Sequence, residues 1–499
     1  MTFSSLEFLF VFFPVVLGIN FILPKKVKNY WLLAASLFFY AWGEPTFFFL
    51  LILSTIVNYC SALVLSKAGD SITSSGKTVF SIKGKFPKIW KAFHTCPSRK
   101  ILFVVILILN IGCLFVTKYL NFLTSELRRI FPCCGSVIPQ TSFILPLGFS
   151  FITFQSVSYI IDVYRGMPPE KNYFFYTLYI TFFPQLLQGP ILRYTDFHPF
   201  LTDRKTTLKD FESGIIRFLT GLNQKVLLAN ILSEISDKVF EGGGISFGMA
   251  WLGMVAFSFQ LYFDFAGYSD MAIGLGYMFG FRFKENFDFP YASNNMTEFW
   301  RRWHISLGTW FRDYLYFPLG GSRVKRKSRL VFNITVIWLA TGIWHGASWT
   351  FILWGLLHGF FIIFEKLSCM PEKLKKRPAL QWFYRGVIIL AVMYGWMLFR
   401  VQDISQALAY TRRLLKFTGN PWKNSLFRFY SREYIFTLIF SVICAFPLCK
   451  KIRDGISSKG IVAANTVKLF WYLLQLGLAV VSISWMVMSS HNPFLYESF

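Results

Sequence analysis

The chain has 499 residues, of which 54% are hydrophobic and 20% aromatic, and its mean hydropathy is +0.47. These values exclude a disordered chain, a collagen-like repeat and a coiled coil, and they indicate a protein whose solvent is mostly lipid. The 51 Lys and Arg exceed the 25 Asp and Glu by 26, but the basic residues fall between apolar blocks. We therefore attribute the charge to membrane topology and to membrane lipids as partners, and we expect no nucleic-acid partner.

Apolar runs recur along the chain at lengths close to the roughly 20 residues that a helix needs to cross a bilayer. They predict an all-α polytopic membrane protein with about 11–13 transmembrane helices and some re-entrant or interfacial helices. The first run has no basic residue before it and no small-residue cleavage site after it, so we expect a retained span. The runs cover residues 5–23, 30–44, 46–66, 101–120, 142–163, 173–192, 247–266, 330–347, 349–365, 383–399, 433–449 and 467–488.

Basic loops indicate the orientation of the chain. Residues 24–29 and 67–100 are rich in Lys and Arg, which predicts that both loops face the cytoplasm and that the N-terminus lies outside. The basic segment 400–432 would face outward in a simple alternation of spans, so its topology stays open. Mixed apolar and charged spacing in 208–238 and 404–416 predicts amphipathic surface helices.

Several motifs of known chemistry are absent from the sequence. The eight cysteines form no C-x-x-C and no Cys/His cluster of zinc spacing, so we expect no metal. Ser75-Gly76-Lys77-Thr78 lacks the upstream glycine of a phosphate-binding loop, and the chain has no G-x-S-x-G or H-E-x-x-H. The remaining chemistry is that of histidine without an evident protein nucleophile.

Ionisable residues inside apolar runs are functional candidates, because a charge in lipid is costly unless it faces a cavity or a partner. Asp264 and Asp270 interrupt one apolar run, and His345 interrupts another. His358 competes with His345 on the same argument, and spacing alone does not rank the two histidines.

Residues 281–328 do not have the pattern of a simple span, because they mix aromatic, polar and charged side chains. Such a segment must be buried in protein, lie in the headgroup layer or line a cavity. Helical spacing over 297–316 groups Arg301, His304 and Gly308 on one face. One interpretation is a basic interfacial helix with an aromatic belt. The other is a cytoplasm-facing donor site, in which guanidinium groups meet phosphates and His304 lies close to the reacting group.

Three stretches closely resemble the membrane-bound O-acyltransferase (MBOAT) superfamily, in its bacterial alginate O-acetyltransferase-like branch. They are FDFAGYSDMAIGLGYMFGFRFKENFDFPY, TEFWRRWHISLGTWFRDYLYFPLGG and GIWHGASWTFILWGLLHG. With FSSLEFLFVFFPVVLGINF, ILPLGFSFITFQSVSYIIDVYRG and FFPQLLQGPILRY, the resemblance covers most of residues 1–400. Residues 401–499 match only as apolar helices, and we expect a single family domain over 1–499.

The resemblance implies helices around a central tunnel, with a cytosolic acyl donor on one side and an extracytoplasmic acceptor on the other. It places the family's catalytic histidine on His345 and its second characteristic histidine on His304. The branch commonly has a histidine at His358 too, whose role stays open, and Ala266 replaces a serine often seen in the family. We expect the substrate to be bound by polar and aromatic residues of the matching segments, namely Asp264, Tyr268, Asp270, Arg301, Arg302 and Trp344.

Histidine suits acyl transfer to a hydroxyl because its ordinary pKa of about 6.5 lies near neutrality. A base that takes the hydroxyl proton typically contributes about 10²–10⁴-fold to the rate, and we assign this role to His345. The oxyanion needs hydrogen-bond donors, for which His304 or a backbone N–H near Gly342 or Gly346 is expected. Exclusion of water from the tunnel favours transfer over hydrolysis of the thioester.

We therefore expect an O-acetyltransferase of the bacterial cytoplasmic (inner) membrane, with acetyl-CoA as donor, no bound cofactor, and a polysaccharide or cell-wall glycan as acceptor. The resemblance implies a separate extracytoplasmic acetyltransferase as partner. The alternatives are D-alanyl or other acyl transfer to a cell-wall polymer, a glycan or lipid transporter without covalent chemistry, and a non-catalytic scaffold. Dependence of activity on the His345 imidazole separates an acyltransferase from a transporter or scaffold.

Overall fold

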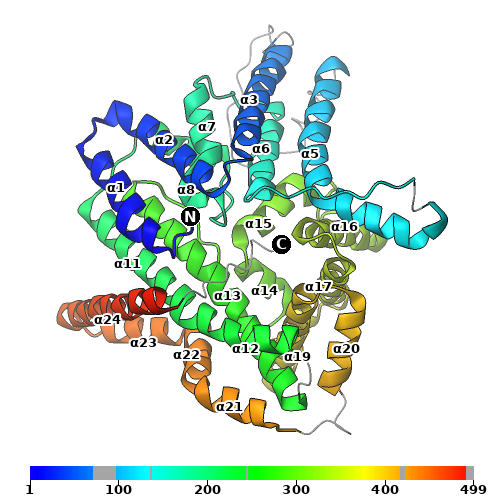
Figure 1. Cartoon of the computed structure of the whole chain (residues 1–499), viewed down its shortest axis with the longest axis vertical. Coiled ribbons are helices and arrows are strands. Elements are labelled where there is room, and N and C mark those ends of the chain that lie inside the picture. The colour runs from blue at the N-terminus through cyan, green and yellow to red at the C-terminus, as the bar shows by residue number, and fades with distance from the viewer. Residues whose placement is uncertain (71–96, 135–136, 243–245, 416–421, 490–499) are drawn as a thin grey trace. The chain divides into compact units, whose positions relative to one another are not determined.

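The computed structural model describes residues 1–70, 97–134, 137–242, 246–415 and 422–489, and every regular element in these ranges is a helix (Figure 1). This confirms the all-α class. By contacts the chain divides into two compact units. The first comprises Met1 with 13–187 and 191–205, and the second comprises 2–12, 188–190 and 206–499.

The first unit contains a group of packed helices in which α3, α5 and α6 contact one another and α2 packs on α7. Arg99 is buried among them, donates to Leu65 O and Tyr164 O, and lies over the Tyr164 ring. One guanidinium thereby joins three helices. The helices are α1 (Phe13–Ile22), α2 (Lys25–Gly43), α3 (Phe48–Asp70), α5 (Pro97–Ile130), α6 (Phe149–Tyr164), α7 (Tyr173–Thr181), α8 (Phe183–Leu186), α9 (Tyr194–Phe197) and α10 (Pro199–Thr202), with the 3₁₀ turn η2 (Pro132–Cys134).

The second unit is built around α13 (Phe247–Met278), a long helix that is mostly buried and contacts α11, α12 and α19. Its other helices are α11 (Leu208–Gln224), α12 (Asn230–Glu241), α14 (Met296–Arg302), α15 (Ile305–Phe311), α16 (Lys327–His345), α17 (Trp349–Ser368), α18 (Met370–Leu374), α19 (Pro378–Arg400), α20 (Ile404–Leu415), α21 (Ser425–Glu433), α22 (Ile435–Ala445), α23 (Leu448–Ser457) and α24 (Ile461–Met488). Short π- or 3₁₀-helical segments are η1 (Phe8–Phe12), η3 (Lys225–Ala229), η4 (Pro290–Ala292) and η5 (Arg312–Tyr316).

By length and apolarity, six helices of the described residues are able to cross a membrane, or seven if the bent pair α22 and α23 is one span. The chain is a multi-pass membrane protein, with fewer such helices than the about 11–13 expected from apolar runs. Some runs form shorter or broken helices: 173–192 is interrupted at Phe182, and 142–163 contributes only the 16 residues of α6. The six are α3, α5, α13, α17, α19 and α24. The central tunnel stays a prediction.

The two predicted amphipathic segments are confirmed as helices. Residues 208–238 form α11, η3 and most of α12, and residues 404–415 form α20, which buries Ala407, Tyr410 and Leu414. The basic loop 67–100 lies mostly outside the described residues, so its predicted cytoplasmic side stays a prediction.

Glycines allow α11 and α13 to approach closely. A Cβ on Gly221 would lie 2.3 Å from Gly267 O, and a Cβ on Gly267 would lie 2.7 Å from Gly221 O. Gly214 and Gly274 repeat this reciprocal contact two turns away, at 2.8 and 2.6 Å. Small residues at such crossings let helix backbones pack in membranes. The close approach also brings cations of α11 and η3 against carboxylates of α13.

Gly221→Ala is expected to destabilise the second unit by about 1–3 kcal/mol or more, because the added methyl meets backbone atoms that cannot rotate away. Besides Gly267 O, the new Cβ would lie 2.8 Å from Met271 N. The matched control is Gly386→Ala within α19, where nothing lies within 4 Å of the added atom. There the higher helix propensity of Ala predicts a gain of up to about 1 kcal/mol. Thermal unfolding of the purified variants measures both, and equal effects would contradict the close crossing.

Candidate active site

His345 is the last residue of α16 and lies in an aromatic enclosure with 6% of its surface exposed. Its ring centroid lies 4.7 Å from that of Trp344, 4.8 Å from that of Trp354 and 5.1 Å from that of Phe399. These neighbours come from α16, α17 and α19. The imidazole is therefore held on three helices in a site that largely excludes water.

Close packing of α16 on α17 fixes the position of His345. A Cβ on Gly342 would lie 2.5 Å from Phe351 O, and a Cβ on Gly355 would lie 2.4 Å from Trp338 O. The turn between the helices ends at Ser348, whose hydroxyl accepts from Thr350 N and caps α17. The GIWHG sequence thus places the histidine at a tightly packed helix end, where a side chain in place of Gly342 would not fit.

His304 lies at a break between α14 and α15, with φ +45° and 1% of its surface exposed. Its Nδ1 is 3.1 Å from Asn286 Oδ1. The same oxygen accepts from the backbone N–H of Ser306 at 3.2 Å, which fixes the orientation of the Asn286 amide. An oxygen acceptor requires a proton on Nδ1, so Nε2 carries a lone pair. This buried Nε2 has no hydrogen-bond partner among the described residues.

The role expected for His304 as an oxyanion donor does not fit this geometry. Burial lowers the pKa of His304 to about 3, so the ring is neutral near pH 7. Its single N–H is given to Asn286, and the free position is an acceptor. His304 is thus suited to receive a hydrogen bond from a substrate hydroxyl.

The continuous helix expected over 297–316 is wrong. The chain is extended at Trp303 and left-handed at His304, so Arg301, His304 and Gly308 do not share one helical face. The break is held by Asn286, whose carbonyl accepts from Ile305 N at 2.9 Å while its side chain binds Ser306. Trp303 is buried against Trp396, with ring centroids 4.6 Å apart. Much of this segment is buried in protein, so it is not a simple interfacial helix.

His304 and His345 are brought together through Trp344, whose ring centroid lies 6.4 Å from that of His304 and 4.7 Å from that of His345. Phe265 of α13 lies edge-on to His304 at 4.6 Å. Ser269, one turn further along α13, accepts from the Asn286 amide at 3.0 Å. Two buried histidines from different segments therefore lie near one tryptophan.

Asp264 and Asp270 are each neutralised by a cation that sequence reasoning missed. Lys225 of η3 lies 2.5 Å from Asp264, and both side chains are almost fully buried. Arg217 of α11 donates to Asp270 at 2.7 Å and to Glu285 at 3.2 Å. Lys225 and Arg217 lie within the segment recognised only as amphipathic. The two aspartates thus have internal partners, and their substrate role stays a prediction.

The other predicted binding residues have different surroundings. Tyr268 is buried and stacks on Phe3 with ring centroids 4.6 Å apart. Arg302 pairs with Glu298 at 2.8 Å, while the Arg301 side chain is exposed. Of the two predicted arginines, Arg302 is therefore used in an ion pair within the protein, whereas Arg301 faces solvent.

His358 is surrounded by tryptophan side chains, one of which also contacts His345. Trp300 Nε1 donates to His358 Nδ1 at 3.3 Å, and the rings of Trp354 and Trp338 lie 5.1 and 5.6 Å away. Trp354 contacts both His345 and His358, so the two histidines share a wall. Because its Nδ1 accepts, His358 has the opposite tautomer from His304.

Glu365 is a further residue that sequence reasoning missed. This buried carboxylate accepts from Met296 N at 2.6 Å, Thr297 N at 2.9 Å and the Tyr384 hydroxyl at 3.0 Å. It therefore occupies the N-terminus of α14, where unsatisfied N–H groups favour an anion. A lone acid near the end of apolar α17 was the available sequence signal. Its contacts hold the helix that leads into His304.

Because His304 is neutral in the folded protein, the free energy of unfolding is expected to fall as the pH is lowered. The pKa of His304 is about 3 in the folded state and about 6.5 in the unfolded state. Between these pH values the unfolded state therefore binds more protons than the folded state. Stability present above pH 6.5 is lost as the pH falls, at up to about 1.4 kcal/mol per pH unit from this group. Thermal unfolding from pH 7.5 to 4.5 should show a shallower slope for His304→Gln, and an unchanged slope would contradict a buried neutral ring.

Comparison with known proteins gives matches that include this site. The model of the MBOAT, membrane-bound O-acyltransferase family, matches residues 170–411. "Probable alginate O-acetylase AlgI" of Azotobacter vinelandii is 41% identical over 409 residues, covering 82% of this chain and 76% of that protein. The protein of that name in Pseudomonas putida is 35% identical, with both chains fully covered. "Peptidoglycan O-acetyltransferase" of Helicobacter pylori is 31% identical over 455 residues, covering 84% of this chain and 80% of that protein.

The family match extends over α13 to α17 and so includes both histidines, the break at His304 and the carboxylates of α13. The helices able to cross a membrane agree with a match to a family of membrane-bound enzymes. The chain therefore belongs to the membrane-bound O-acyltransferase family and is a multi-pass membrane acyltransferase of the O-acetyltransferase type.

Proposed function

We propose that this enzyme transfers acetyl groups from acetyl-CoA to hydroxyls of an extracytoplasmic polysaccharide or cell-wall glycan, directly or through a partner transferase. Its proposed location is the bacterial cytoplasmic membrane. The observation that carries the proposal is the pair of buried histidines, His304 and His345, whose rings both lie near Trp344. The relatives named as alginate and peptidoglycan O-acetyltransferases support a glycan as the acceptor.

In the proposed reaction, His345 takes the proton of the acceptor hydroxyl as its oxygen attacks the thioester carbonyl. The C–O bond forms, the tetrahedral intermediate collapses with loss of the C–S bond, and the histidine returns the proton to the leaving thiolate. The C-terminal end of α16 presents carbonyl groups whose partial negative charge stabilises the transient imidazolium. Acetyl ester and free thiol are the products, so atoms and charges balance.

His304 is proposed to orient the acceptor, because its bare Nε2 is a buried hydrogen-bond acceptor. The oxyanion then needs another donor. Gly346 N makes only a long hydrogen bond of 3.4 Å to Gly342 O, which suits a backbone N–H that turns toward a developing charge. The aromatic walls around His345 exclude water and so favour transfer over hydrolysis.

Membranes containing the full chain and its partner proteins provide the test. Acetyl-CoA labelled in the acetyl group is supplied, and label is measured in the isolated glycan and in free acetate. Label in an alkali-labile ester on the glycan supports the proposal. A glycan that takes label only from D-alanine, or no glycan label while acetyl-CoA is consumed to acetate, contradicts it.

A further inference from the structure

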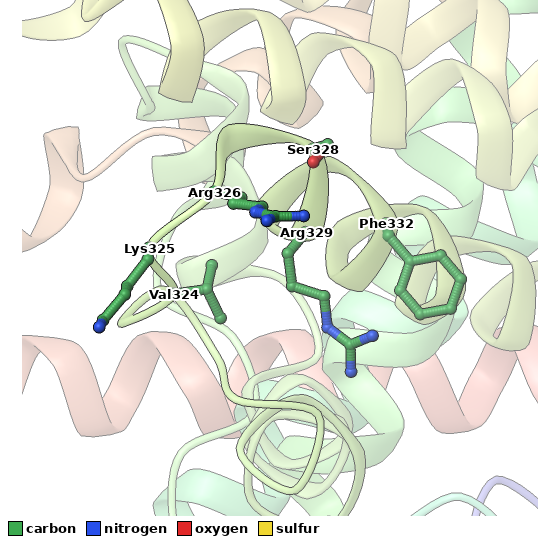
Figure 2. Close-up of a pocket in the computed structure, with 6 residues that line it drawn as sticks. All are labelled: Val324, Lys325, Arg326, Ser328, Arg329 and Phe332. Atoms are coloured by element: carbon green, nitrogen blue, oxygen red, sulfur yellow. The ribbon is translucent and has the colours of Figure 1, made fainter.

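A basic pocket of about 550 Å³ opens at the start of α16, the helix that ends at His345. Figure 2 shows Arg326 in the region between Ser328 and Arg329, while the Lys325 ammonium points away from them. Phe332 lies one turn along the same helix. The lining consists of Val324, Lys325, Arg326, Ser328, Arg329 and Phe332.

The pocket carries positive charge from three side chains, Lys325, Arg326 and Arg329. No carboxylate of the described residues forms an ion pair with Lys325, Arg326 or Arg329. Some more deeply placed cations of the second unit do have acidic partners, as Lys225 has Asp264 and Arg400 has Asp237. Lys325, Arg326 and Arg329 are therefore available to an external anion.

The pocket also offers several hydrogen-bond donors. Arg326 is the N-cap of α16, no side chain caps this end, and its first turn contains no acidic residue. Helix N–H groups and a Ser328 hydroxyl therefore add to the guanidinium groups. Arg329 is oriented by a hydrogen bond of 3.4 Å to Leu319 O and by the Phe332 ring, 5.1 Å from its guanidinium carbon. This combination of groups is typical of a phosphate site.

We propose that this pocket binds the phosphate of an anionic membrane phospholipid. Phe332 has half of its surface exposed beside the arginine, which gives the lipid's first acyl carbons an apolar contact that a free phosphate does not need. The positive-inside rule places a basic loop of a membrane protein at the cytoplasmic surface, where anionic lipids concentrate.

The length of α16 favours a lipid over the acyl donor. From Arg326 to His345 the helix rises by about 28 Å, at 1.5 Å per residue. A phosphate in the pocket therefore lies far from the imidazole, at the opposite end of the helix. The lipid site does not rest on the proposed function, because it uses none of the residues assigned to the acetyl transfer.

The test compares two double variants that each remove two charges from the same loop. Arg326→Gln with Arg329→Gln removes the pocket's guanidinium groups, and Arg323→Gln with Lys327→Gln changes two exposed residues that do not line it. Binding of phosphatidylglycerol to the purified full chain is measured by native mass spectrometry across a lipid titration. Phosphatidylcholine, inorganic phosphate and adenosine 3′,5′-bisphosphate are titrated in parallel, and size-exclusion chromatography checks folding.

The expected result is a loss of at least about tenfold in phosphatidylglycerol affinity for the pocket variant and a change below about twofold for the loop control. Equal losses in both variants would show that net charge alone attracts the lipid, and would overturn the site. Equal binding of phosphatidylcholine would overturn the preference for an anionic lipid. Displacement of the lipid by adenosine 3′,5′-bisphosphate or phosphate at equal concentration would show that the pocket takes a soluble phosphate instead.

Discussion

His345→Ala is expected to lower acetyl transfer by about 10²–10⁴-fold, the contribution of a positioned general base. The reason is local: the imidazole packs against Trp354 and Phe399, and no other titratable side chain of α16 is buried there. His345→Gln keeps the polarity and most of the volume and should lose as much activity. Rates of labelled acetyl transfer in membranes with equal amounts of each variant measure the effect.

The control for this experiment is His198→Ala, since His198 is half exposed and belongs to the first unit. Its transfer rate should stay within about twofold of the native rate. A His345→Ala enzyme with native activity would show that His345 is not the base. In that case His304, with its bare Nε2, would be the group to change next.

Lys225→Met is expected to destabilise the protein by about 3–5 kcal/mol, because it leaves the Asp264 carboxylate buried without its ammonium partner. The two groups lie 2.5 Å apart and are 2% and 1% exposed. Replacing both, as Lys225→Met with Asp264→Leu, should recover most of the loss, since a buried ion pair and an apolar pair of similar volume have similar stability. The midpoint of unfolding in a detergent titration measures the three variants.

A partly exposed pair provides the matched control. Arg302 and Glu298 lie 2.8 Å apart with 32% and 25% of their side chains exposed, so Arg302→Met should cost only about 0–1 kcal/mol. Additive effects of the two changes at Lys225 and Asp264 would contradict a coupled buried pair. Measuring acetyl transfer by the double variant separates stability from activity. If Asp264 binds substrate, the double variant should be inactive even though its stability is restored.

The amino-acid sequence was sufficient to predict the class of the protein and to single out His345 as a candidate. Hydropathy needs only neighbouring residues, so the apolar runs were sufficient to predict an all-α membrane protein. The amphipathic periods of 208–238 and 404–416 were likewise local, and both are helices. His345 was found because a lone ionisable group in an apolar run is conspicuous whatever surrounds it, and its assignment as the base stays a prediction.

Which groups meet depends on how the helices pack. Periodicity over 297–316 predicted one helix, but Asn286, 18 residues before His304, holds the break between α14 and α15. Arg217 pairs with Asp270 across 53 residues, and Glu365 caps α14 across 69. Hydrogen bonds and ion pairs depend on distances in space, which a local pattern does not contain. For that reason the neutral, acceptor state of His304 and the cations that compensate the aspartates appear only once the helices are packed.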